Sequence, residues 1–443
     1  MRPALRGRSS RGLLGLAAAL LAATLVACGG PRTLIVTPYV VECECDETCR
    51  FAAVPAPLRS GDIPIIYVTD RAPSPDAADP SQSFSYRRGG EIRFGVATVS
   101  FAPAMDWPTL VRQSRSASRG AVYRLGLESI APMGSLTGQN AWLDIVENRM
   151  VIRGDAEGRI RGEEAAFQEL VRRWLDVTPR KEVFLFVHGF NNHFEDAVFR
   201  IAELWHFLGR VGVPITYTWP AGRGGLRGYA YDRESGEYTV LHLKQVLRAL
   251  ARMPDLERIN IIAHSRGTDV TVSALRELYI EARVDQASVD ERLKLGTLVL
   301  AAPDIDYDVF TQRFGGEMLV NAPRRTVIYF SPDDEAIWFA RWLFDSLRRL
   351  GSLMASDLSE SDRKLLARLP RLEMVDCAVS GFSTSHNYVF SHPSAMSDLL
   401  VVLRDDADPG TPQRPLRRSD GVVWELDNAY LCPPGGLRQT FGP

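Results

Sequence analysis

The sequence has few lysines, no excess of charge of either sign, and a single long apolar run. Lysine occurs only at Lys181, Lys244, Lys294 and Lys364, a skew that we interpret as coding-sequence bias rather than function. Basic and acidic residues nearly balance, at 52 against 54, so the formal net charge is -2. This balance gives no bulk electrostatic reason to bind nucleic acid, and we expect no nucleic-acid partner.

The composition is that of a globular protein. Hydrophobic residues make up 45% and charged residues 24% of the 443 positions, which excludes a disordered, collagen-like or coiled-coil chain. The length exceeds the roughly 150 residues of an average domain. Because single α/β domains often run longer than average, we expect one large core domain with additions at both ends.

The one long apolar run lies at the N-terminus, between residues 13 and 27, and follows four arginines. It is shorter than the about 20 residues that span a bilayer core, and the order of basic and apolar residues is typical of a cleaved signal segment. Residues 25–28 resemble the lipobox of bacterial lipoprotein signal peptides. The resemblance implies that residues 1–27 are removed and that Cys28 carries an acyl chain such as palmitate; the alternative is a plain secretory signal with a chance cysteine.

The residue after the predicted lipidation site bears on the destination of the protein. Gly29 follows Cys28, where some lipoproteins of this type have Asp. The resemblance therefore implies an outer-membrane protein of the cell envelope that faces the periplasm or the cell surface. A membrane, bound through the lipid anchor, is the predicted partner, and the oligomeric state stays open.

Five cysteines remain after the predicted cleavage, and an oxidising compartment permits disulfides. Cys43, Cys45 and Cys49 cluster near the mature start, whereas Cys377 and Cys432 lie far downstream. We expect Cys432 to bridge back to the cluster, a second bridge inside the cluster, and a buried thiol at Cys377. A metal site is the competing interpretation, but no Cys-x-x-Cys pair or matching histidine pair supports it.

The chain divides into three predicted segments after the signal peptide. Residues 28–60 are expected to be a tether with a Cys-rich segment, and residues 61–404 an α/β domain. The C-terminal tail, residues 405–443, is expected to pack back on this domain. Two β-rich stretches, Ile63–Thr69 and Ile92–Phe101, look like strands added at a sheet edge. From about Glu163, short apolar strands alternate with helices, which predicts a doubly wound, mostly parallel sheet covered on both faces. The strands are predicted at 183–187, 214–218, 259–263, 298–301, 326–330 and 372–379, and the helices at 194–208, 237–251, 268–280 and 335–350.

A serine stands at the predicted turn between strand 259–263 and the next helix, in the sequence Ala263-His264-Ser265-Arg266-Gly267. Such a turn pushes the serine hydroxyl above the sheet and requires small residues on both sides, which Ala263 and Gly267 provide. Glycine usually stands at both places, so Ala263 is a conservative departure. By itself the pentapeptide also fits an ordinary helix cap.

A second loop at the same sheet edge offers hydrogen-bond donors. His188 and Gly189 follow the predicted strand 183–187, where backbone N–H groups can bind an oxyanion together with the residue after a nucleophile. The predicted donors are the amides of Phe190 and Arg266. We interpret His188 as a structural histidine that braces the loop.

Activation of a serine requires an imidazole and an orienting carboxylate, expected in the order serine, acid, histidine. His386, in a loop of small residues, is the predicted base, while His392 precedes Pro393 and is expected to cap the last helix. Asp334 is the predicted acid and Asp304 is its rival. Either aspartate is also in a position to cap a following helix.

The set of motifs between Ile63 and Val402 resembles the bacterial α/β-hydrolase family of unknown function, which is serine esterase or lipase-like in its site. The motifs are Thr69-Asp70-Arg71, Phe94-Gly95, His188-Gly189-Phe190-Asn191, Trp219-Pro220, Ala263–Gly267, Ala302-Pro303-Asp304 and Ser385-His386-Asn387-Tyr388. Ser385 replaces a glycine of the family, and Arg266 stands where Met is common. The resemblance implies an α/β-hydrolase fold.

These features predict a serine hydrolase for a small acyl or lipid substrate, with Ser265, His386 and Asp334 as its triad and no metal or organic cofactor. The alternatives are an acyltransferase with the same residues and a non-catalytic envelope binding module. We expect the pocket walls to come from loops at 101–160 and 340–370. Arg223, Arg227 and Arg233, with Asp232 and Glu234 nearby, are interpreted as a solvated rim in one Gly-rich loop.

Overall fold

The computed structural model describes residues 32–44, 49–74, 77–137, 143–284, 289–337, 340, 348–369, 371–379 and 386–430. Cys28, Cys45 and Cys432 lie outside these ranges, so the lipid anchor stays a prediction. Cys377 is buried with a free thiol, as predicted. Cys49 is also buried with a free thiol, so it belongs to neither predicted bridge, and the two cysteines left in the cluster allow at most one of the two bridges.

Within the described residues, one sheet of eleven strands runs in the order β12-β13-β11-β10-β9-β8-β6-β7-β1-β2-β3. All neighbours from β13 through β1 pair in parallel, whereas β12, β2 and β3 pair antiparallel at the two margins. The strands are β1 Ile63–Pro73, β2 Phe84–Ala102, β3 Arg124–Thr137, β6 Glu182–Val187, β7 Val213–Thr218, β8 Arg258–His264, β9 Leu295–Ala301, β10 Arg325–Phe330, β11 Leu372–Ala378, β12 Arg417–Ser419 and β13 Val423–Asp427. The predicted mostly parallel α/β architecture is confirmed.

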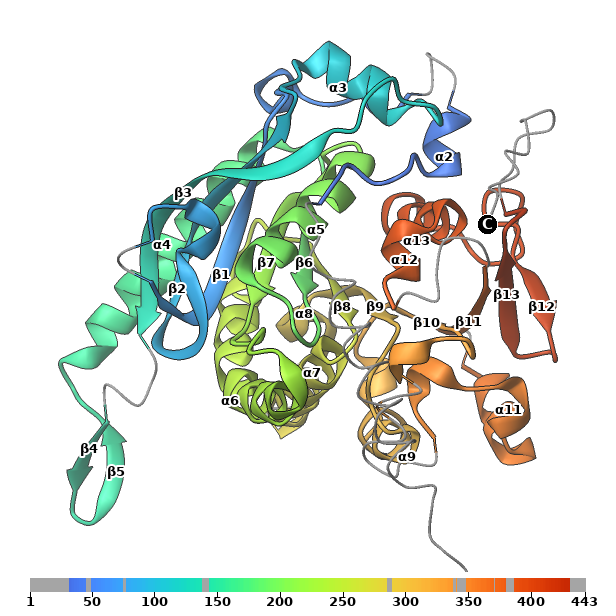
Figure 1. Cartoon of the computed structure of the whole chain (residues 1–443). Coiled ribbons are helices and arrows are strands. Elements are labelled where there is room, and N and C mark those ends of the chain that lie inside the picture. Colours follow the sequence, from blue (N-terminus) through green and yellow to red (C-terminus); the bar gives the residue numbers. More distant parts are fainter. Residues whose placement is uncertain are drawn as a thin grey trace, which may run out of the picture.

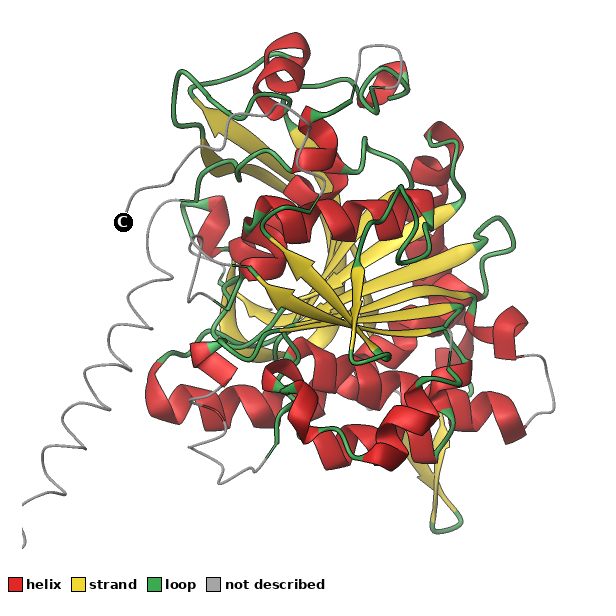
Figure 2. Cartoon of the chain, turned by 90° about the vertical axis from the view of Figure 1, so that its right-hand side faces the viewer, coloured by secondary structure: helices red, strands yellow, loops and turns green. Residues whose placement is uncertain are grey.

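Helices cover both faces of the sheet (Figure 1, Figure 2). Helices α4 (Ala156–Val177), α6 (Gly225–Ala251) and α7 (Gly267–Val284) share one buried apolar cluster, and α5 (Phe194–Phe207) and α13 (Pro393–Asp405) share another. Strand β6 is buried at all six positions because its alternate side chains enter both clusters. The shorter helices are α2 Tyr39–Glu42, α3 Trp107–Ser114, α8 Val289–Leu293, α9 Tyr307–Phe310, α11 Glu360–Leu366 and α12 Tyr388–Ser391.

The N-terminal strands differ from the expected edge pair. Strand β1 lies inside the sheet, between β7 and β2, and the edge is formed by β3, which the sequence pattern did not reveal. Most of β3 is exposed or half-buried, so its sequence lacks a run of apolar residues. Strand β3 lies five strands from β8, or about 24 Å at the usual strand spacing. Residues 124–137 are therefore too far from Ser265 to wall its pocket.

After β3 the chain forms a small hairpin of β4 (Leu143–Val146) and β5 (Arg149–Ile152), which projects beyond the end of α4 in Figure 1. Its turn residues, Glu147 and Asn148, both have positive φ, the conformation of a tight two-residue hairpin turn. No described helix is long and apolar enough to cross a membrane.

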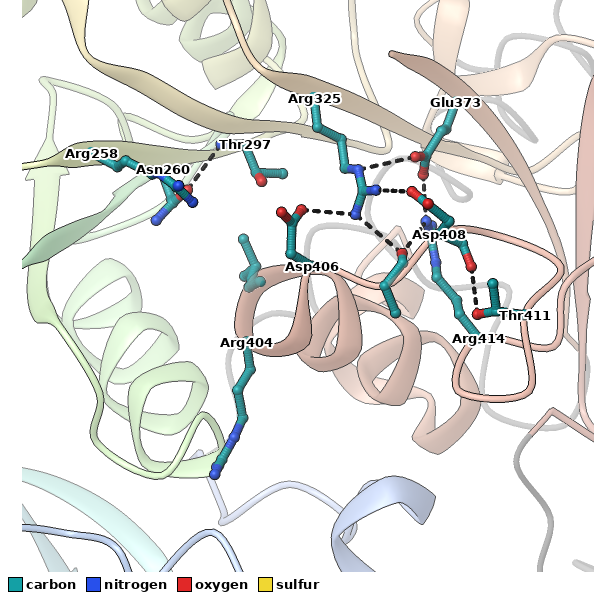
Figure 3. Close-up of polar contacts among 12 residues, drawn as sticks. Arg258, Asn260, Thr297, Arg325, Glu373, Arg404, Asp406, Asp408, Thr411 and Arg414 are labelled. Atoms are coloured by element: carbon teal, nitrogen blue, oxygen red, sulfur yellow. Dashed lines mark hydrogen bonds and ion pairs between the residues drawn. The ribbon is translucent and has the colours of Figure 1, made fainter. Parts of the chain in front are cut away.

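Both ends of the described chain pack against the α/β domain. In the segment expected to be a tether, the described part is anchored by Arg32, which donates to Glu203 on α5 at 2.9 Å, and by the buried side chain of Phe51. The tail after α13 is held at the start of β10, where Arg325 pairs with Asp406 at 3.0 Å and with Glu373 at 3.2 Å (Figure 3).

A buried network joins the tail to the sheet more firmly. Asp398 on α13 is fully buried and accepts hydrogen bonds from Arg414 Nε at 2.9 Å and from the hydroxyls of Tyr329 and Tyr430 at 2.6 and 2.7 Å. Arg414 also pairs with Glu373 on β11. Strands β12 and β13 then extend the sheet beside β11, so residues 405–430 are part of the folded body.

Candidate active site

Ser265 occupies a sharp turn between the end of β8 and the start of α7. Its φ is +52°, in the left-handed region that a non-glycine residue rarely adopts, and such strain is typical of functional turns. Its N–H donates to the carbonyl of Ala301 at 2.9 Å, which ties the turn to β9. The turn also needs Gly267, because a Cβ there would overlap the carbonyl oxygen of His188.

The loop after β6 lies directly against the serine. A Cβ built on Gly189 would stand 2.5 Å from Ser265 Cβ and 3.1 Å from its Oγ, so only glycine fits at this approach. Within the described chain, neither the Phe190 amide nor the Arg266 amide donates a hydrogen bond to another group. Two backbone donors are thus left unused beside the serine, as an oxyanion site requires.

His188 braces this loop from below. Its Nδ1 lies 2.8 Å from the carbonyl of Gly189, and its Nε2 accepts from the N–H of Trp219 at 3.0 Å. The ring stacks on the Trp219 indole at 5.1 Å. Burial and the nearby charge of Arg71 hold the pKa of His188 well below its usual value, so the ring is neutral and structural.

His386 and Asp334 form a hydrogen-bonded pair. Nδ1 of His386 lies 2.7 Å from Oδ2 of Asp334, whose side chain is fully buried. The other carboxylate oxygen, Oδ1, accepts from the N–H groups of Ala336 and Ile337, both at 3.1 Å. The carboxylate therefore caps a helical turn with one oxygen and orients the imidazole with the other.

The pKa of His386 is raised above its usual value. Burial alone would lower it, but the charge of Asp334 and its hydrogen bond, with a further contribution from the charge of Asp304, outweigh burial. The side chain of His386 stays 20% exposed, so its other nitrogen can meet a ligand at the sheet edge.

His386 lies beside the serine turn, although Ser265 Oγ makes no hydrogen bond to it in the described structure. His264, the residue before the serine, has its Nε2 3.1 Å from the carbonyl of His386, and the two imidazole rings are 4.9 Å apart. In serine hydrolases without substrate, this hydrogen bond is often long and tightens only in the complex. Residues 381–385 of the predicted histidine loop lie outside the described part.

Asp304, the rival acid, has other partners. Its carboxylate accepts from Arg349 Nη1 at 2.8 Å and from the Tyr229 hydroxyl at 2.5 Å, and its carbonyl oxygen lies 3.4 Å from Arg266 Nη1. Asp304 affects His386 only electrostatically, through the negative charge of its carboxylate. The geometry favours Asp334 over Asp304 as the orienting carboxylate.

His392, as predicted, caps α13, with its Nδ1 accepting from the Ser394 N–H at 3.2 Å.

The structure corrects the predicted Gly-rich loop in part: the side chains of Arg223, Arg227, Arg233 and Glu234 are exposed, as expected of a solvated rim. Helix α6 begins at Gly225 rather than at Glu237, so Arg227 and Arg233 stand on a helix. Asp232 is not solvated but only 1% exposed, and its Oδ2 accepts from the N–H groups of Asn191 and Gly222 at 3.0 and 3.2 Å. Its burial raises the pKa of Asp232 to about 6. This role of Asp232 was not predicted from the sequence, because glycines in the first turns of α6 hid the start of the helix.

A mostly parallel sheet with a serine on a strand-to-helix turn, two free amides beside it and a histidine–carboxylate pair from later strand ends defines the class of α/β hydrolases. The chain belongs to the family described as alpha/beta hydrolase of unknown function (DUF900), whose model matches residues 163–403, just over half of the 443 residues. A comparison with curated proteins gives no match.

Proposed function

We propose that the protein is a serine hydrolase that cleaves a carboxylic ester or a related acyl bond. The observation that carries the proposal is the Asp334–His386 pair beside the strained turn of Ser265. A carboxylate-oriented imidazole next to a serine on a strained strand-to-helix turn is the minimal machinery for acyl transfer.

In the proposed reaction, Ser265 Oγ attacks the carbonyl carbon while His386 Nε2 takes the hydroxyl proton. The amides of Phe190 and Arg266 donate to the oxyanion of the tetrahedral intermediate. The bond from the carbonyl carbon to the leaving oxygen then breaks, and His386 passes its proton to the leaving alcohol. Water attacks the acyl-serine in a second round with the same proton transfers, which returns the free acid and the serine.

The test is covalent labelling of the mature protein with a fluorophosphonate, followed by turnover of esters of increasing acyl length. We expect labelling and turnover by the wild type, and loss of both in Ser265→Ala. Ser129→Ala, which changes an exposed serine on β3, is the matched control and should behave as the wild type. Labelling that survives Ser265→Ala would move the nucleophile elsewhere.

A non-catalytic binding module is the second candidate, favoured by the missing hydrogen bond between Ser265 Oγ and His386. A folded wild type with neither labelling nor turnover would support it. An acyltransferase would use the same residues, and adding alcohol acceptors to the ester assay separates the two: a hydrolase releases mainly free acid, whereas a transferase releases mainly the new ester.

We also propose that Cys28 is acylated and anchors the protein in the cell envelope, facing the periplasm or cell surface. Metabolic labelling with a fatty-acid analogue, followed by membrane fractionation, should give a labelled membrane-bound protein that Cys28→Ser releases. An unlabelled wild type in the soluble fraction would contradict the anchor.

A further inference from the structure

Arg71, at the end of β1, joins three segments around the candidate oxyanion loop. Its side chain is fully buried. Nε donates to Thr218 Oγ1 at 2.7 Å, Nη1 to the carbonyl of Ala221 at 2.8 Å, and Nη2 to the carbonyl of Asn192 at 2.8 Å. Nη2 also lies 3.2 Å from Nε2 of His188. One guanidinium thus connects the end of β7 with both sides of the loop after β6.

Asp232, from α6, holds the same loop from another direction. Its Oδ2 accepts from the Asn191 N–H of the oxyanion loop and from the Gly222 N–H of the loop after β7. The carboxylate and the Arg71 guanidinium also attract each other electrostatically. Burial lowers the pKa of Arg71 only to about 10, so the guanidinium remains charged at neutral pH.

These contacts bracket the amide of Phe190. On one side, Gly189 lies against Ser265; on the other, Asn191 is held at its N–H by Asp232 and Asn192 at its carbonyl by Arg71. Asn191 also has a φ of +54°, which an unrestrained asparagine adopts only in a minority of its conformations. The direction of the Phe190 N–H therefore depends on both buried side chains.

We propose that Arg71 and Asp232 are positioning residues that aim the Phe190 amide at the developing oxyanion. The inference rests on the proposed function and deepens it. It makes strand β1, which lies before the segment matched by the family model, a working part of the active site. Neither residue touches the reacting atoms; both act through the loop between His188 and Asn192.

The competing explanation is that both residues only stabilise the fold, since removal of a buried charge is costly wherever it lies. Arg210 supplies a matched control. It is also a fully buried arginine, and its Nη1 donates to the carbonyl of Leu58, far from the oxyanion loop. Arg71→Met and Arg210→Met both remove a buried guanidinium, but only the first should disturb the Phe190 amide.

The experiment measures kcat and KM for a short-chain ester, together with the affinity for a trifluoromethyl ketone, which binds as an oxyanion. All variants are compared at a temperature where circular dichroism shows them folded. For Arg71→Met we expect kcat to fall on the order of 10 to 100-fold with KM nearly unchanged, and inhibitor affinity to fall by a similar factor. Arg210→Met should lose thermal stability but keep kcat and inhibitor affinity within about threefold of the wild type.

Asp232 offers a second, milder pair of variants in case Arg71→Met does not fold. In Asp232→Asn the amide oxygen can still accept from Asn191 and Gly222, so kcat should stay within about threefold of the wild type. Asp232→Ala removes both hydrogen bonds, and kcat should fall on the order of tenfold or more with KM unchanged. Activity that is kept in Asp232→Asn but lost in Asp232→Ala would show that the hydrogen-bond acceptor at position 232, rather than its charge, positions the loop.

The inference is overturned if folded Arg71→Met or Asp232→Ala keeps kcat and inhibitor affinity near wild-type values. It is also overturned if Arg210→Met loses as much of both as Arg71→Met does. The proposed function fails by a different result, namely a wild type that neither turns over esters nor reacts with a fluorophosphonate at Ser265.

Discussion

Replacing Asp334 by asparagine tests the proposed triad most sharply, because it removes one charge and hardly changes the shape. In the wild type, Asp334 Oδ1 accepts from the N–H groups of Ala336 and Ile337. An asparagine must keep its oxygen there, since its NH₂ group cannot accept. The NH₂ group then faces His386 Nδ1 and requires that nitrogen to accept a hydrogen bond. The proton of the neutral ring moves to Nε2, the nitrogen that must take the serine proton.

The expected loss in kcat is about 10⁴-fold, the size of effect that the wrong histidine tautomer causes in a serine hydrolase. This corresponds to roughly 5.5 kcal/mol of transition-state stabilisation. KM should change little, because Asp334 is buried and is separated from any substrate by the imidazole.

The pH dependence has a defined sign. His386 must be neutral to act as a base, and its pKa is raised above 6.5 by Asp334 and Asp304 against the effect of burial. In the wild type, kcat/KM should rise with pH through a pKa above 6.5. In Asp334→Asn the largest raising contributions are lost while burial remains, so the residual activity should rise at a lower pH. The same linkage adds stability that is complete below pH 6.5 and is lost as pH increases through the folded-state pKa.

The assay is a pH profile of kcat/KM with a soluble ester for the wild type, Asp334→Asn and Asp304→Asn. Asp304 is paired with Arg349 at 2.8 Å and both are nearly buried, so Asp304→Asn should mainly lower the free energy of unfolding. Its kcat should exceed that of Asp334→Asn by at least about 100-fold. An Asp334→Asn enzyme within tenfold of the wild type, or a larger loss in Asp304→Asn, would refute the assignment of the acid.

Two further predictions rest on other contacts. Gly189→Ala should lower kcat about 100-fold without unfolding the protein, because its Cβ would lie 2.5 Å from Ser265 Cβ, and activity near the wild-type value would contradict the close approach. Asp398→Ala should lower the free energy of unfolding in urea by about 3–5 kcal/mol, because it leaves the fully buried Arg414 without its main counter-charge. Glu360→Ala, which breaks the exposed pair with Lys364 on α11, is the control and should change that free energy by less than about 1 kcal/mol.

The core of the fold is predictable from the sequence, because the central strands are buried on both faces and therefore appear as continuous apolar runs. Strands β6, β8 and β10 lie within a residue or two of their predicted bounds. The margins of the sheet escape prediction for the opposite reason. Strand β3 is largely exposed, and β12 has only three residues, so neither carries an apolar pattern that differs from a loop.

At the site, the sequence predicts the functional residues that lie at strand ends. It does not predict those that reach the site from elements remote in the chain. The His386–Asp334 contact follows from chain order and strand position. The contacts of Asp232 do not, because they join a helix to two loops that are remote in the sequence. The sequence also left Asp304 and Asp334 as alternative acids, since each follows a strand. They are distinguished only in the folded structure, where the carboxylate of Asp304 is bound by Arg349 and Tyr229.

Ser265 Oγ and His386 Nε2 are not hydrogen-bonded to each other in the described structure. This arrangement still allows catalysis, because hydrogen bonds of other atoms hold each of the two residues in place. The carbonyl of His386 is fixed by His264 and its Nδ1 by Asp334, so Nε2 is the one ring atom without a partner among the described residues. The Ser265 backbone is fixed at both its N–H and its carbonyl, and only its hydroxyl is free to turn. Neither the hydroxyl nor Nε2 has a hydrogen bond to another described residue that would have to break first, which is the condition for a contact that forms when substrate binds.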